Sequence, residues 1–243
     1  MRESPEPLYR RLKEWVAEKI ESGEWPPGHR LPPELKLAAE FSLSRATVRQ
    51  AMNLLVHQGL IERTRGSGTF VARPKVAHNL LGAFSIAEDV LRAGATPRVR
   101  VLGIDRRKPL ASVVARLGLA ANEDVYEVRR LILADDEPLI LVTNWLPAQR
   151  FPRLEDKPLQ RGMGTVFREI FGVECRRQHK EVEVTTLDEQ EAALLEVAAH
   201  TPALLVSYVS YSAENEPFEY RKMVVRGDRC KYFVDLDAPE PLV

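Results

Sequence analysis

The sequence predicts an α+β fold divided into two domains, and three observations support this. Residues 1–74 place apolar side chains at helical spacing in three short segments and then contain two strand-like runs joined by glycines. From about Phe84 the pattern changes to alternating strands and helices, with polar turns between consecutive strands. Consecutive hairpins favour a largely antiparallel sheet with packed helices, so we expect a second domain over 83–243 and a connector over 75–82.

In the first domain, three helices are predicted before a hairpin. The first ends at Gly23, and its apolar positions recur every four residues: Leu8, Leu12, Val16 and Ile20. Pro33 starts a short second helix without a side-chain acceptor, whereas Ser44 is a good N-cap for a third helix that Gly59 ends. The runs 60–64 and 69–71 then form a hairpin whose turn needs positive φ at glycine.

In the second domain the predicted strands and helices alternate. Strands are expected at 98–106, 124–134, 138–146, 178–186, 203–212, 217–226 and 229–236. Helices fit at 86–93, 109–117, 164–171 and 188–197.

Composition excludes several other classes of protein. With 243 residues, 44% hydrophobic and 29% charged, the chain is neither disordered nor low in complexity. The longest uncharged stretch, 197–213, contains His200 and Pro202 and does not suit a membrane helix, and the first residues lack a signal-peptide core. Cys175 and Cys230 stand far apart, so we expect neither a disulfide scaffold nor a metal site, and a reducing cytoplasm.

The second and third predicted helices have the spacing of a helix-turn-helix, which lays its second helix in the major groove of DNA. The outer side of that helix presents Arg45, Ala46, Thr47, Arg49, Gln50 and Asn53, and the hairpin after it predicts a wing. Although the whole chain has a net charge of 0, residues 41–73 carry a net charge of +4. An ordinary solvated basic face is the alternative.

This segment resembles the amino-terminal domain of the GntR family of bacterial transcription regulators, over roughly residues 6–73. The resemblance rests on the motifs LPPE, SRATVRQA, GLI and GSGTFV. It implies that Arg45 and Arg49 contact DNA and that Gly66 in the wing approaches the minor groove. Together with the helix start and the hairpin, the predicted DNA-binding residues are Ser44, Arg45, Thr47, Arg49, Gln50, Arg65, Gly66, Gly68 and Thr69. Leu35 stands where many members carry a backbone-contacting arginine, and Lys36 is the neighbouring candidate replacement.

The second domain lacks the usual catalytic motifs. There is no GxSxG, HExxH, Walker loop or GxGxxG, so we predict no catalytic residue, no metal and no cofactor. Residues 83–238 instead resemble the UTRA domain, the effector-binding half of the HutC-type branch of the GntR family. The recognisable pieces are AFSIAEDVLRAGATPRVRVLG, LADDEPLILVTNWLPAQRFP, TLDEQEAALLEV and PFEYRKMVVRGDR.

That resemblance implies a chorismate-lyase-like fold that acts as a receptor. It places Ser85, Arg130, Thr165 and Glu219 in the effector cavity, with Phe167 at a position that is tyrosine in relatives. Relatives that bind phosphosugars often have polar residues where this chain has Ile132, Val142 and Val225, which favours a smaller or more apolar acid. The alternative is that these residues are simply core and that Arg130 pairs with an acid of the sheet.

Taken together, the sequence predicts a ligand-responsive transcription regulator, a repressor that binds a palindromic DNA operator as a homodimer and responds to a small acidic metabolite. Two other readings remain open. The second domain could be a lyase-like enzyme tethered to DNA, or it could serve only for dimerisation.

Overall fold

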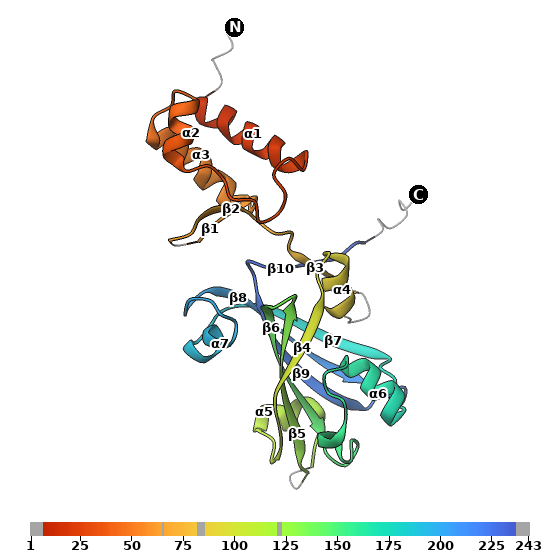
Figure 1. The fold of residues 1–243 in the computed structure, drawn as a ribbon. Helices are drawn as coiled ribbons and strands as arrows, with labels where there is room; N and C mark the ends of the chain where they lie inside the picture. Colours follow the sequence, from red (N-terminus) through yellow and green to blue (C-terminus); the bar gives the residue numbers. More distant parts are fainter. Residues whose placement is uncertain (1–6, 65, 82–85, 121–122, 237–243) are drawn as a thin grey trace, which may run out of the picture. The chain divides into compact units, whose positions relative to one another are not determined.

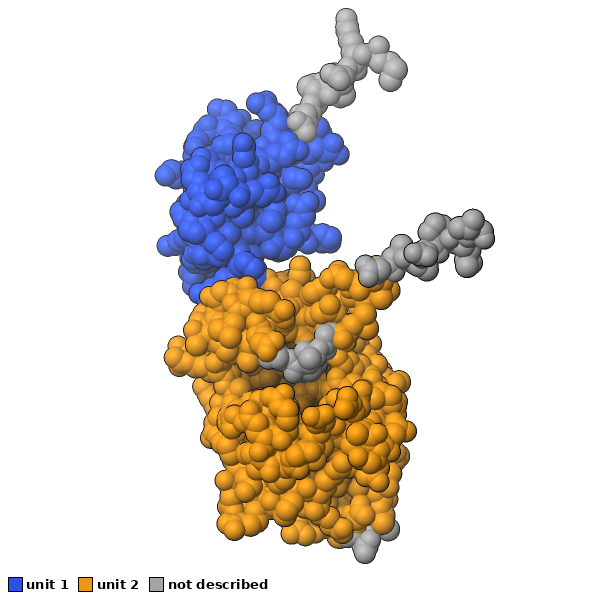
Figure 2. All heavy atoms as spheres, turned by 90° about the vertical axis from the view of Figure 1, so that its right-hand side faces the viewer, with its two compact units in different colours: residues 1–74 blue, residues 75–243 orange. Residues whose placement is uncertain are grey.

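The computed structural model describes residues 7–64, 66–81, 86–120 and 123–236, and it divides into two compact units. The first unit comprises residues 1–74 and the second residues 75–243 (Figure 2). No helix in these described ranges is long and apolar enough to cross a membrane.

The first unit is a three-helix domain with a two-stranded wing (Figure 1). Its elements are α1 (Leu8–Glu21), α2 (Glu34–Glu40), α3 (Arg45–His57), β1 (Ile61–Thr64) and β2 (Gly68–Val71). One apolar cluster holds them together, with Leu12, Val16, Leu37, Met52 and Leu55 all at most 1% exposed. The predicted caps are confirmed: the Ser44 hydroxyl accepts from the Thr47 N–H at 3.1 Å, and Pro33 caps α2 without a side-chain hydrogen bond.

The second unit is built on a six-stranded antiparallel sheet, which confirms the predicted α+β class. The strand order is β4-β5-β6-β9-β8-β7. The strands are β4 (Pro97–Arg107), β5 (Val125–Ala134), β6 (Glu137–Pro147), β7 (Arg177–Thr186), β8 (Pro202–Tyr211) and β9 (Pro217–Arg226). The helices are α4 (Ile86–Arg92), α5 (Ala111–Leu117), α6 (Met163–Phe171) and α7 (Glu189–Leu194), with a short 3-10 helix, η1 (Leu154–Asp156).

Helices cover both faces of this sheet (Figure 1). We call the face covered by α4 and α6 the inner face. There, α4 packs with Ile132, Val142 and Val225, and α6 packs with Val128 and Phe218. On the outer face, α7 packs against residues such as Leu131, and α5 packs against residues such as Val209. The inner face therefore has two apolar clusters, and Arg130 lies on β5 between Val128 and Ile132.

The expected connector at 75–82 contains a strand. Residues Val76–Asn79 form β3, which pairs in parallel with β10 (Cys230–Phe233) as a separate two-stranded sheet. The final predicted strand, 229–236, is therefore shorter than expected and does not join the large sheet. Four residues give too little periodicity to be recognised, and the partner strand lies about 150 residues further along the sequence.

Candidate DNA-binding surface and effector site

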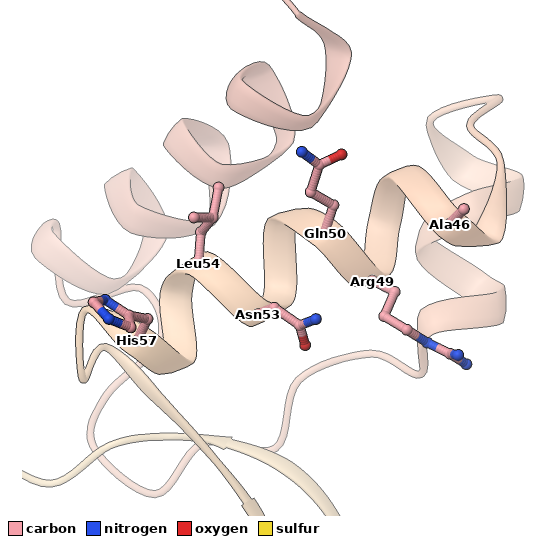
Figure 3. Close-up of a pocket in the computed structure, with 6 residues that line it drawn as sticks. All are labelled: Ala46, Arg49, Gln50, Asn53, Leu54 and His57. Carbon is pink, nitrogen blue, oxygen red and sulfur yellow. The ribbon is translucent and has the colours of Figure 1, made fainter.

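The exposed face of α3 carries the predicted DNA-reading side chains. Ala46, Arg49, Gln50, Asn53, Leu54 and His57 line one shallow pocket on it. Figure 3 shows Arg49 and Asn53 pointing to one side of the helix and Gln50 to the other. Arg45 is also exposed, whereas Val48, Ala51 and Met52 face the core. The helix thus turns a polar surface with amide and guanidinium donors outwards, as major-groove readout requires.

A carboxylate in α2 joins this surface to the wing. Glu34 Oε2 accepts from Arg49 Nε at 3.5 Å, and its Oε1 accepts from Arg63 NH2 at 2.9 Å. Arg63 lies on β1 and also donates from NH1 to Asn53 Oδ1 on α3 at 2.8 Å. The Arg49 side chain remains 61% exposed, so its terminal nitrogens stay available for DNA. Arg63 therefore links α2, α3 and the wing.

The wing has the predicted tight turn. Gly66 and Gly68 adopt φ of +79° and +128°. A Cβ at Gly68 would lie 3.1 Å from Arg30 Nε, so the glycine also permits a close approach of that side chain. Thr69 pairs with Arg63 across the hairpin, and Arg65 lies outside the described residues. On α2, Leu35 is 60% exposed and Lys36 is exposed beside it.

The inner face of the large sheet contains a buried polar cluster. Arg130 is 3% exposed, Arg221 7%, Glu219 1% and Asn144 0%. Arg221 donates to Glu219 Oε1 from Nε at 3.0 Å and from NH2 at 2.6 Å, and its guanidinium lies 4.7 Å from the Tyr208 ring centroid. The cluster therefore contains two guanidinium groups and one carboxylate, and the carboxylate pairs with Arg221, which leaves one excess positive charge.

Arg130 carries this excess charge. No carboxylate of the described chain lies within ion-pair distance of it, and its buried Nε makes no hydrogen bond there. Its NH2 donates to Asn144 Oδ1 at 3.2 Å, and its NH1 donates to the Arg161 carbonyl at 3.5 Å. Burial, and next the neighbouring charge of Arg221, lower the pKa of Arg130 to about 10, so it stays charged at neutral pH. The alternative in which Arg130 pairs with an acid of the sheet finds no such pair among these residues.

The remaining predicted effector residues occupy different settings. Thr165 lies half-buried in the first turn of α6, four residues after Arg161. Phe167 is 3% exposed and packs between Phe151 and Phe218, each with a ring-centroid distance of 5.3 Å, so packing alone accounts for its burial. Ser85 lies outside the described residues. Ile132, Val142 and Val225 belong to the apolar cluster under α4, beside the polar one.

The view of Figure 2 looks onto the side on which α4 and α6 lie in Figure 1, and it shows the surface of the second unit hollowed there. On the outer face, a separate cavity of about 230 Å³ includes Thr143, Trp145 and Lys222 in its lining. Within the described ranges, no group of three or more histidine, cysteine, aspartate or glutamate residues is placed to hold a metal ion.

Sequence reasoning missed Glu34, Asn144 and Arg221. Asn144 had a recognisable signal, because it is a polar residue within the largely apolar predicted strand 138–146, and the structure buries it. Arg221 lies two residues after Glu219 on β9 and directly opposite Asn144. The contact between Glu34 and Arg63 joins residues from different elements, and no local pattern reveals it.

Comparison with known proteins matches both units to family models. Residues 8–71 match the model for bacterial regulatory proteins of the gntR family, and residues 92–231 match the UTRA domain. The chain is 31% identical to the HTH-type transcriptional repressor NagR of Bacillus subtilis over 239 residues, with 97% of each chain covered. It is 26% identical to the histidine utilization repressor of Pseudomonas putida, covering 94% of this chain and 92% of that one. The crystal structure of PhnF from Mycobacterium smegmatis superposes with a TM-score of 0.69 at 28% identity, covering 96% and 100% of the two chains.

Proposed function

The chain belongs to the GntR family of bacterial regulatory proteins, and on that premise we propose that this repressor binds a palindromic operator as a homodimer under the control of a small acidic effector. Its similarity to named repressors over nearly the whole chain sets it among transcription regulators and not enzymes. The finer parts of the proposal rest on the two surfaces described above.

Operator reading is assigned to α3 and the wing. Arg45, Arg49 and Gln50 are exposed on α3, and arginine and glutamine suit guanine and adenine edges respectively. The Ser44 cap fixes the start of the helix, where free backbone N–H groups favour a phosphate. Gly66 and Gly68 supply the positive φ of the turn in the wing, which we assign to the adjacent minor groove.

Effector binding is assigned to the inner face around Arg130. The single observation that carries it is a guanidinium that is buried and charged, without a carboxylate partner among the described residues. Burying such a charge alone is unfavourable, and an anionic ligand would compensate for it. The Thr165 hydroxyl is a suitable second donor, and one carboxylate matches the one excess charge. A domain that served only for dimerisation would have no use for this arrangement.

A thermal-shift screen of the full chain against small carboxylic acids and phosphate esters tests the effector. A ligand that binds the native state raises the melting temperature by mass action. We expect hits among monocarboxylates and unchanged ligand after prolonged incubation. Exclusive stabilisation by phosphate esters would contradict an acid of low charge, and turnover of a hit would favour a catalytic domain.

Selection of bound duplexes from a random DNA library tests the operator. We expect the selected sequences to contain two inverted half-sites. Enrichment of a single unsymmetrical site would contradict a palindromic operator.

A further inference from the structure

The buried polar side chains of the large sheet form one continuous run of hydrogen bonds that ends at Arg130. Gln178 Nε2 donates to Ser210 Oγ at 3.1 Å, and Ser210 donates to Glu219 Oε2 at 2.9 Å. Asn144 Nδ2 then donates to Glu219 Oε1 at 2.6 Å, and Asn144 Oδ1 accepts from Arg130 NH2 at 3.2 Å. The run crosses β7, β8, β9, β6 and β5, five of the six strands.

The Glu219 carboxylate accepts four hydrogen bonds from its neighbours in the sheet. Its Oε1 accepts from Asn144 and twice from Arg221, and its Oε2 accepts from Ser210. Three of these hydrogen bonds end on Oε1 and one ends on Oε2, so both oxygens of the carboxylate take part in the run. These hydrogen bonds give Glu219 a structural function within the sheet, and its direct contact with the effector stays a prediction.

The chemistry of its neighbours determines how the Asn144 amide is oriented. The ionised Glu219 carboxylate only accepts hydrogen bonds, so the amide NH2 must face it. The Arg130 guanidinium only donates, so the amide oxygen must face Arg130. The amide cannot flip without losing both hydrogen bonds in a buried setting, where an unmade hydrogen bond is costly.

Asn144 and the Arg161 carbonyl together hold the two terminal nitrogens of Arg130. The Nε–H is left without a partner among the described residues, and it is buried. Two fixed nitrogens and one free donor make a guanidinium whose orientation is set before any ligand arrives.

We infer that Glu219 and Asn144 are positioning residues for the effector: Glu219 orients Asn144, Asn144 holds Arg130, and the Nε edge of Arg130 takes the effector's carboxylate. The inference rests on the proposed effector function, and it gives Glu219 a role that acts through Asn144, apart from the predicted contact with the ligand. Arg221 has the separate task of neutralising Glu219, held between that carboxylate and the Tyr208 ring.

Nitrogen-15 NMR of the arginine Nε–H groups in the full chain tests the relay without any ligand. The spectrum of Arg130→Lys identifies the Arg130 signal by its disappearance. We expect Glu219→Gln and Asn144→Ala each to shift that signal. Glu219→Gln should add no further shift in the Asn144→Ala background, because its effect passes through the amide. Glu183→Gln, at an exposed carboxylate on β7, is the matched control and should leave the signal in place.

Equal shifts from Glu219→Gln with and without Asn144 would overturn the relay, because Glu219 would then act on Arg130 directly through space. If Asn144→Ala does not fold, Asn144→Ser replaces it, since a serine side chain is too short to reach both neighbours.

Titration with sodium acetate at constant ionic strength then tests the effector contact. We expect acetate to move the wild-type Arg130 signal, and each positioning variant to weaken acetate binding about 3- to 10-fold, the effect of one hydrogen bond. The double variant should be no weaker than Asn144→Ala alone. If acetate does not shift the wild-type Arg130 signal, the proposal of an acidic effector is overturned. If the losses of acetate affinity add up in the double variant, only the relay is overturned.

Discussion

Arg49 is the residue whose chemistry is most directly tied to operator reading. Its guanidinium is tethered at Nε by Glu34, while the rest of the side chain is open to solvent. A bidentate contact to guanine is worth about 1–3 kcal/mol, so Arg49→Ala should lower specific affinity by that amount, mostly at one position of each half-site. Binding isotherms on single-base variants of the selected operator measure this loss of affinity. Arg168→Ala, at an exposed arginine of α6, is the control.

Two other outcomes for Arg49 have different meanings. A uniform loss across all sequences with a shallower salt dependence would assign Arg49 to a phosphate. An unchanged isotherm would remove it from the DNA-binding surface altogether.

Arg130 offers a test of ligand response that leaves the fold in place. In Arg130→Met, a side chain of similar length removes the buried charge, while Asn144 Oδ1 loses its donor. The two effects oppose each other, so the free energy of unfolding should change by less than about 2 kcal/mol. The variant should bind operator as the wild type does without effector and lose its response to the effector. A folded variant that still responds fully would place the ligand elsewhere.

At the residue scale, the sequence pointed to Arg130 and Glu219 only through a family resemblance, and it did not reveal the hydrogen bonds that join Glu219 to Asn144 and Arg221. The reason is register: Glu219 lies opposite Ser210, and Asn144 lies opposite Arg221, so the carboxylate finds partners on both sides. A single sequence does not show which residues lie opposite each other on neighbouring strands. The caps at Ser44 and Pro33 were predictable because capping is decided by neighbouring residues.

At the scale of elements, the wing is held to α2 and α3 by Arg63. Its two hydrogen bonds reach Asn53 and Glu34 at 2.8 and 2.9 Å, and the side chain is 39% exposed. Since a half-exposed ion pair contributes little, Arg63→Ala should destabilise the first unit by only about 0.5–1.5 kcal/mol. Operator affinity should nevertheless fall, because Glu34 is then free to draw Arg49 away from DNA and the wing loses its anchor.

Chemical denaturation and operator titration, measured on the same preparation, separate these two effects of Arg63→Ala. Lysine lacks the forked guanidinium group, so Arg63→Lys keeps the positive charge but cannot contact Asn53 and Glu34 together. It should therefore recover little operator affinity. Full recovery by lysine would show that Arg63 acts as a simple positive charge for DNA.

Long elements were predictable and short paired ones were not. The strands of the large sheet have ten or eleven residues each, and their alternation or continuous apolar character is visible in sequence. In contrast, β3 has four residues, and its structure depends on β10, on a contact between His78 and Asp89 of α4, and on Lys75 donating to the Gly227 carbonyl at 2.6 Å. Tertiary partners, not local propensity, make β3 a strand.

For the whole molecule, the absence of net charge conceals an uneven distribution. The chain has 35 basic and 35 acidic residues, yet α3 and the wing are basic. α3 and the wing therefore form a basic surface that can attract DNA, and a single winged unit contacts few bases. Specific binding then requires two copies of the protein, because the binding free energies at two linked half-sites add to one another.

This argument predicts a dimer with two-fold symmetry. Sedimentation of the full chain at micromolar concentration should show a dimer, both free and on DNA. The selected operator should carry inverted half-sites whose centres lie about 10–10.5 base pairs apart or a multiple of that spacing. Inserting about five base pairs between the half-sites turns them to opposite faces of the duplex, so affinity should fall towards that of a single half-site. A monomer in both states, or an operator that tolerates the insertion, would contradict paired binding.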